Sequence, residues 1–193
     1  MGGGEVVRYF NWNAGANVWK VVLVSLVIPH LAISEDNPEW RLKEKNEATQ
    51  FAIKEDKIAF LGDFGKDSLL VGFFNTFTST TLLNYYKLLT PFASPHATTE
   101  CTKSFSNANF RQEVLSIKVS ALILHGNADK IVPIEISSER TTALIVDNKF
   151  IIYDDAPHDL FHTDKNKLND DLLEFLTRNL KIKMVGICKM TTF

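Results

Sequence analysis

The stretch ALILHGNADKIVP, residues 121–133, decides the fold class of this chain. Its first four residues, 121–124, form an apolar run that is typical of a strand covered on both faces of a parallel sheet. Residues 21–27 and 150–153 form two further runs of the same kind. Segments with helical spacing separate the three runs, so the sequence predicts an α/β fold with parallel strands and right-handed crossovers.

Working outward from these strands, the chain divides into three parts. Residues 1–33 and 114–180 carry the strands and form the predicted core, residues 34–113 form a helical insertion that caps it, and residues 181–193 form a divergent tail. We expect helices over residues 5–10, 44–57, 80–89, 97–105 and 135–146, and a last helix that Thr163 or Asp164 caps. Seven phenylalanines of the insertion form its own core or line a substrate pocket, and we favour the core: Phe51, Phe60, Phe64, Phe73, Phe74, Phe77 and Phe92.

Composition limits the function classes. The chain has 193 residues, of which 45% are apolar and 23% charged, with a net charge of −2. These values are those of a globular protein, and they give no reason to expect a nucleic-acid or membrane partner. Cys101 and Cys188 form no zinc-binding pattern and suit free thiols in a reducing compartment, so we expect a cytoplasmic protein. No ligand spacing suggests a metal or another cofactor.

Two loops after predicted strands carry the candidate catalytic residues. Asp129 follows the strand at 121–124, and His158 follows the strand at 150–153. Neighbouring parallel strands bring their carboxyl ends to one edge of the sheet, where functional groups of α/β proteins gather. There a carboxylate can accept a hydrogen bond from one imidazole nitrogen and stabilise the ring when the other nitrogen takes a proton. The order Asp before His fits the second and third members of a Ser-Asp-His triad.

Several strings together resemble the cofactor-free haloperoxidase and arylesterase family of α/β-hydrolases. They are GGGEVVRY (2–9), FASP (92–95), KSFS (103–106), LHGNADKIVP (124–133), APH (156–158) and LNDDLLEFL (168–176). The resemblance implies a partial α/β-hydrolase fold, with Asp129 as the triad acid and His158 as the base. It also implies acyl transfer to water or hydrogen peroxide from a small ester or carboxylic acid. No cofactor would take part.

The nucleophile is the main departure from that family. The family's serine lies in Gly-x-Ser-x-Gly, and Met1 and Gly2 match the last two positions, so the serine would fall before residue 1. The resemblance makes the Met1 backbone an oxyanion-hole donor. We expect the chain to be inactive alone, since Ser25 lies inside a predicted strand and the other serines lack elbow glycines.

Three interpretations stay open. The chain is the C-terminal part of such a hydrolase, or it begins at an internal start codon with the serine encoded upstream. Alternatively, it is a non-catalytic assembly module that pairs with a separate N-terminal piece, or with a second copy, through the open edge of strand 21–27. The remaining histidines and tryptophans are expected to be structural, with His125 packed at a strand end, His30, His96 and His162 in loops or at the surface, and Trp12, Trp19 and Trp40 packed.

Overall fold

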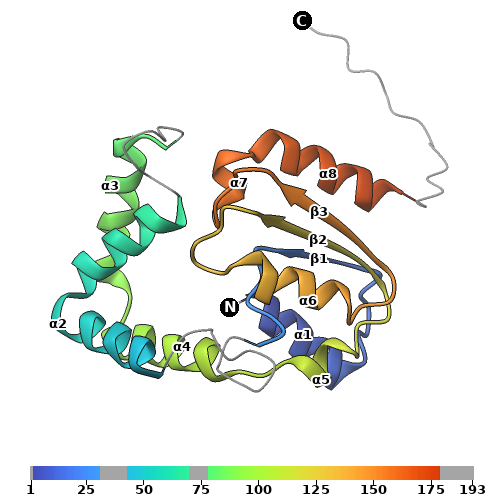
Figure 1. Cartoon of the computed structure of the whole chain (residues 1–193), viewed down its shortest axis with the longest axis horizontal. Coiled ribbons are helices and arrows are strands. Elements are labelled where there is room, and N and C mark those ends of the chain that lie inside the picture. Colours follow the sequence, from blue (N-terminus) through green and yellow to red (C-terminus); the bar gives the residue numbers. More distant parts are fainter. Residues whose placement is uncertain (1, 31–42, 70–77, 179–193) are drawn as a thin grey trace, which may run out of the picture.

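A three-stranded parallel sheet forms the centre of the protein (Figure 1). The computed structural model describes residues 2–30, 43–69 and 78–178. The strands, in their order across the sheet, are β1 (Lys20–Val24), β2 (Ser120–Gly126) and β3 (Asn148–Tyr153). This architecture confirms the predicted α/β class with parallel strands.

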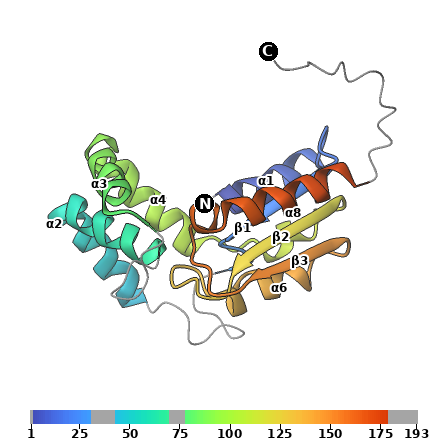
Figure 2. The ribbon, with the colours of Figure 1, turned by 90° about the horizontal axis from the view of Figure 1, so that it is seen from above.

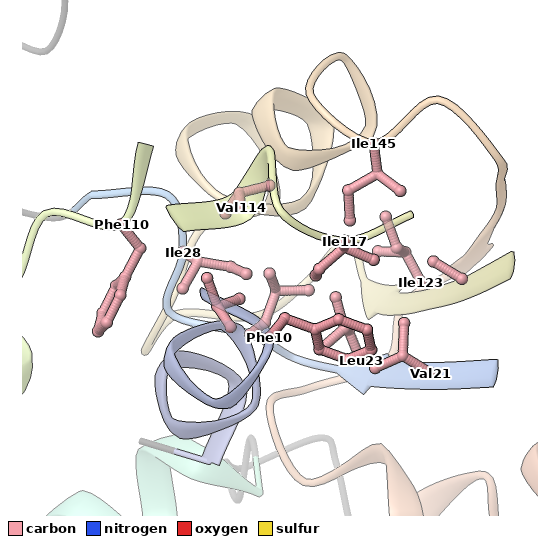
Figure 3. Close-up of a cluster of buried hydrophobic side chains, with 12 residues drawn as sticks. Phe10, Val21, Leu23, Ile28, Phe110, Val114, Ile117, Ile123 and Ile145 are labelled. Atoms are coloured by element: carbon pink, nitrogen blue, oxygen red, sulfur yellow. The ribbon is translucent and has the colours of Figure 1, made fainter. Parts of the chain in front are cut away.

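Helices cover both faces of the sheet. On one face lie α1 (Gly2–Asn13) and α6 (Ser138–Thr142), and on the other lies α8 (Lys165–Thr177), as Figure 1 shows. Side chains alternate along β2, so Ile123 joins the cluster with α1 while Leu122 and Leu124 pack toward α8. Figure 3 draws the first cluster, which includes Phe10, Val21, Leu23, Ile28, Phe110, Val114, Ile117, Ile123 and Ile145.

A lysine on the first strand fixes the end of α8. The Lys20 ammonium donates a hydrogen bond to the backbone carbonyl of Phe175 at 2.6 Å and lies 5.0 Å from the centre of the Phe175 ring. The last carbonyls of a helix have no partner within the helix and carry partial negative charge, so a cation there is stabilising. This contact joins β1 to α8, the last described helix.

The remaining helices lie between β1 and β2 in the sequence. They are α2 (Lys43–Ser68), α3 (Thr80–Leu89), η1 (Thr90–Phe92), α4 (Pro95–Asn107) and α5 (Arg111–Val114). α2 contacts both α3 and α4, and the three helices lie to one side of the sheet in both views (Figures 1 and 2). α5 instead packs against α1. α2 is broken at Asp56, whose backbone is non-helical and whose carboxylate accepts from the Ala59 N–H, which starts a new helical segment.

Several predicted boundaries shift. The first helix begins at Gly2 rather than at residue 5, and the first strand ends at Val24 rather than at residue 27. The predicted helix at 135–146 is a short turn, η2 (Ile134–Ile136), followed by α6. The last helix is preceded by a short helix, α7 (Leu160–Thr163), and Asp164 occupies its N-cap without a side-chain cap bond.

Some predictions about single residues are wrong. Trp12 and Trp19 were expected to pack, yet their side chains are largely exposed. His30 was expected in a loop or at the surface; it lies outside the named strands but is buried, and its Nδ1 lies 2.9 Å from the Ala108 carbonyl oxygen. Within the insertion, Phe51 and Phe92 are exposed and so belong to no core.

The division into core, cap and tail stays a prediction. The described residues leave out residues 31–33 of the predicted core, residues 34–42 and 70–77 of the predicted cap, and the tail at 181–193. Met1, Trp40, Phe73, Phe74 and Phe77 also lie outside them. Among the helices that are described, none is long and apolar enough to cross a membrane.

Candidate active site

The structure brings the two predicted residues together at the carboxyl edge of the sheet. Asp129 follows β2, His158 follows β3, and Asp129 Oδ2 lies 2.7 Å from His158 Nδ1. β2 and β3 are paired in parallel up to Gly126 and Tyr153, so their loops leave the sheet side by side. The strand arrows of Figure 1 point toward the side of the molecule that carries α2 and α3. The contact is therefore where the order of strands predicts it; the catalytic roles stay a prediction.

Asp129 is fully enclosed and its oxygens are saturated with donors. Oδ1 accepts from the backbone N–H groups of Ile131 and Val132, both at 2.8 Å, and Oδ2 accepts from His158 and from His125 Nε2 at 3.0 Å. Burial alone raises the pKa of this carboxyl, but the hydrogen bonds from His125, His158 and the Val132 N–H outweigh it and lower the pKa to about 2. Asp129 is therefore a fixed negative charge across the physiological range.

A glycine lets the His158 loop reach Asp129. A Cβ on Gly126 would lie 2.1 Å from the Ala156 carbonyl oxygen, so only glycine permits this approach of two backbones. Asn127 then joins the two loops, because its amide nitrogen donates to Asp154 at 3.2 Å and its oxygen accepts from the Asp155 N–H at 2.7 Å. Asp155 itself has a φ of +56°, which bends the loop back over the sheet.

The backbone on both sides of the His158 ring is anchored. Ser25 Oγ donates to the His158 carbonyl oxygen at 2.8 Å, and the Asp159 N–H donates to the carbonyl oxygen of Ser68 at 3.1 Å. Ser25 was expected inside a strand, but it follows β1 with a φ of +46°. It still continues the ladder, since its N–H donates to the Leu124 carbonyl. His158 is thus held between the end of the sheet and the end of α2.

His158 also lines a cavity of about 390 Å³. The walls come from α2, α3, η1 and the segment 158–162: Leu61, Gly62, Phe64, Gly65, Ser68, Leu69, Leu83, Tyr86, Lys87, Thr90, His158, Asp159, Phe161 and His162. Among the described residues, no serine, threonine or cysteine forms a hydrogen bond with His158 Nε2. Because His158 lines the cavity, a group that enters the cavity can meet its side chain.

A tyrosine on α3 closes the cavity toward α7. Tyr86 Oη is in hydrogen-bond contact with His162 Nε2, and the two ring centres are 5.5 Å apart. Burial, with the nearby charge of Asp159 and with Tyr85, raises the pKa of Tyr86, so its hydroxyl keeps its proton and donates to His162. His162, expected in a loop or at the surface, is half-buried on α7.

Sequence reasoning missed the role of His125. The ring is packed at the end of β2, as expected, but it also donates to Asp129 and contacts Ser138 Oγ at 2.6 Å. The available signal was its place directly after an apolar strand and four residues before the candidate acid. Within the described ranges, no group of three or more His, Cys, Asp or Glu side chains is arranged to hold a metal ion. Met1, the predicted oxyanion donor, is not among the described residues.

Comparison with known proteins gives the same class as the fold and the site. No protein-family model matches the chain. A bromoperoxidase from Bacillus anthracis superposes with a TM-score of 0.86 at 34% identity, over 92% of this chain and 64% of that chain. The "Non-heme chloroperoxidase" of Streptomyces lividans and the "Bifunctional esterase/perhydrolase" of Acinetobacter calcoaceticus are each 30% identical, over 91% of this chain and 64% of their own length.

A parallel sheet with a carboxylate and a histidine after successive strands defines an α/β-hydrolase, here in part. Within that class the chain is similar to the non-haem haloperoxidases and esterases. It spans about two thirds, 64%, of the length of the curated relatives it matches.

Proposed function

We propose that Asp129 and His158 are the acid and base of a serine-hydrolase site that transfers an acyl group from a small ester to water or hydrogen peroxide. The observation that carries the proposal is the 2.7 Å contact between His158 Nδ1 and an enclosed, ionised Asp129, at a histidine that lines a cavity. That arrangement fixes the tautomer in which Nδ1 carries the hydrogen and Nε2 can accept a proton.

The chemistry follows from this geometry. His158 Nε2 takes the proton of an attacking serine hydroxyl as the oxygen bonds to the ester carbon, and returns it to the departing alcohol. In the second half, the same nitrogen takes a proton from water or hydrogen peroxide, whose oxygen attacks the acyl-enzyme, and returns it to the serine. Asp129 stabilises the positive ring in both steps without accepting the proton itself.

The cavity and the relatives support a small substrate. A volume of about 390 Å³ is at the small end for ligand pockets. Apolar side chains such as Leu61, Phe64 and Leu83 suit the hydrocarbon part of an ester. The names of the relatives, esterase/perhydrolase and non-heme chloroperoxidase, fit transfer to water or to peroxide.

We propose further that the 193-residue chain does not hydrolyse esters by itself. The printed sequence contains no Gly-x-Ser-x-Gly motif, and Met1 and Gly2 match only its last two positions. In the family, the serine and the backbone donor matched by Met1 both lie in the sharp turn formed by this motif. A fluorophosphonate probe should therefore fail to label the purified chain, and stoichiometric labelling would contradict this part.

A chimera tests the proposed roles directly. The residues that precede the matched region in the Bacillus anthracis bromoperoxidase are fused in front of residue 1, and hydrolysis of 4-nitrophenyl acetate is measured. We expect activity, and a loss of about 10³-fold or more in kcat/KM on His158→Ala. His96→Ala, an exposed histidine on α4, is the matched control and should change nothing. A folded chimera that is inactive, or that keeps its activity without His158, refutes the proposal.

One observation favours a second function, that of a non-catalytic assembly module. β1 ends the sheet, and among the described residues no strand pairs with its outer edge. Such an edge can pair with a strand of a separate N-terminal piece or of a second copy. Light scattering after size-exclusion chromatography, with and without the bromoperoxidase segment as a separate polypeptide, decides this. A stable monomer that does not bind the segment would contradict the assembly function.

A further inference from the structure

One oxygen of Asp129 serves two histidines. Oδ2 lies 2.7 Å from His158 Nδ1 and 3.0 Å from His125 Nε2. His125 is fully buried at the end of β2, whereas the His158 side chain is 22% exposed and reaches the cavity. The proposed function uses only His158, so the structure contains a second imidazole on the same carboxylate whose role is unassigned.

The contacts of His125 fix its hydrogen positions. Nε2 faces two groups that can only accept, Asp129 Oδ2 at 3.0 Å and the Val132 carbonyl oxygen at 2.9 Å, so Nε2 carries a hydrogen. Nδ1 lies 2.6 Å from Ser138 Oγ, which can donate to it. The neutral ring therefore satisfies every contact, while a charged ring would bury a positive charge with no exposed surface at all.

Neutrality of His125 matters for the charge of the site. Among the described residues, the titratable groups that contact Asp129 are His125, from β2, and His158, from the loop after β3. A neutral donor holds the Asp129 carboxylate in place and offsets part of the free-energy cost of burying its charge. It leaves the full negative charge to stabilise the His158 ring when that ring gains a proton. A positively charged ring in place of neutral His125 would offset the negative charge of Asp129, and Asp129 would then stabilise protonated His158 less.

We propose that His125 is a positioning residue: as a neutral donor it holds Asp129 ionised and in one orientation, so that His158 presents Nε2 to the cavity. This role rests on the proposed function, because an orienting carboxylate matters only where His158 moves protons. Ser138 completes the chain of contacts, since its hydroxyl selects the tautomer of His125 that donates to Asp129.

Two variants of the full 193-residue chain separate positioning from packing. His125→Leu fills the space but removes the donor, and His125→Gln keeps an amide donor near the Nε2 position. The titration of the Asp129 carboxyl carbon is followed by ¹³C NMR. We expect His125→Leu to raise the pKa of Asp129 by about one unit or more, since burial persists with one donor fewer, and His125→Gln to keep most of the wild-type value of about 2.

The control is a buried residue that does not touch the site. Thr141 is fully buried on α6 and donates to the Ile28 carbonyl at 2.9 Å, so Thr141→Val also removes a core hydrogen bond. It should leave the Asp129 titration unchanged. An unchanged titration in His125→Leu overturns the proposal, because His125 then only fills space.

A second measurement needs no variant, which matters if His125→Leu does not fold. Ring ¹⁵N shifts of the wild-type chain at neutral pH report which nitrogen of each histidine carries hydrogen. We expect His125 to be neutral with hydrogen on Nε2, and a charged ring or hydrogen on Nδ1 overturns the proposal. Neither readout uses a substrate, so the two proposals can fail separately. If the chimera is inactive but the Asp129 titration responds to the change at His125, the proposed function is rejected and the positioning role of His125 is kept.

Discussion

The carboxyl edge of the sheet and the helices α2–α4 are built from different kinds of contact. At the edge, several hydrogen bonds join residues far apart in sequence, such as Asp129 and His158, which are 29 positions apart, and Ser25 and His158, which are 133 positions apart. In the helices, most side-chain bonds are local, as in the pair Lys66–Asp63 and the N-cap bond of Ser79. No residue of α3 is buried. The edge therefore defines geometry, and the helices supply walls for the cavity.

This difference indicates where the molecule resists change. A buried polar network loses several contacts when one member moves, because each group left without a partner remains out of water. A helix with local bonds and exposed apolar residues, such as Leu88 and Phe92 beside it, loses little from one substitution. Variants in matched pairs, one in each region, test this contrast.

The largest effect is expected at the loop crossing. Gly126→Val places a side chain where a Cβ alone would lie 2.1 Å from Ala156 O and 2.9 Å from Pro157 O, so the His158 loop must move away. We expect a loss of about 3 kcal/mol in the free energy of unfolding, measured with urea. Gly65→Ala in α2, with no atom within 4 Å of the new Cβ, should instead gain about 0.5–1 kcal/mol. Equal effects would contradict the contrast.

Next in size is the pH dependence that comes from Asp129. Its pKa is lowered from 3.8 to about 2 in the folded protein, so its contribution to stability is present above pH 4 and is lost as the pH falls toward 2. Relative to Asp129→Asn, the wild-type free energy of unfolding should fall by about 2 kcal/mol between pH 5 and pH 2. Asp63→Asn, at an exposed ion pair on α2, is the control. A difference that does not change with pH would show that Asp129 is not held ionised.

The sequence predicts the edge better than the helices, for physical reasons. Apolar runs mark β2 and β3, and strand pairing brings the residues that follow them together, so the Asp129–His158 contact can be expected without coordinates. No such rule applies to the walls of the cavity. Which faces of α2 and α3 look toward His158 depends on how separate helices dock, and Tyr86 has no local signal.

Misses at the edge itself come from contacts that only the folded chain creates. Ser25 reads as a strand residue, but it turns out of β1 with a positive φ and donates to a carbonyl 133 positions away. The sequence leaves open whether His30 lies in a loop or at the surface, and only the folded chain shows it buried against the Ala108 carbonyl. His125 was placed correctly as buried, yet its bond to Asp129 depends on a loop that folds back. Polar residues after strands therefore deserve a functional interpretation even when they are buried.

A smaller effect is expected when the anchor of the His158 backbone is removed. Ser25→Ala leaves the His158 carbonyl without its donor in a buried site, so we expect a loss of about 1–2 kcal/mol in urea. Hydrogen exchange at the Asp159 N–H, which donates to Ser68 O, should become faster as the loop loosens. Ser116→Ala removes a local bond to Glu113 O and should change neither the exchange nor the loop. Unchanged exchange in Ser25→Ala would remove Ser25 from the site.

The smallest effect tests how strongly the two regions are joined. Tyr86→Phe removes the hydroxyl that contacts His162, a direct side-chain bond between α3 and the segment after His158. We expect a loss of about 1 kcal/mol or less in the free energy of unfolding, with faster hydrogen exchange in α3 but not in β2. Tyr85→Phe, the more exposed neighbour on the same helix, is the control. Faster exchange in β2 as well would mean that the helices help to hold the carboxyl edge of the sheet in place. The two regions would then not be independent.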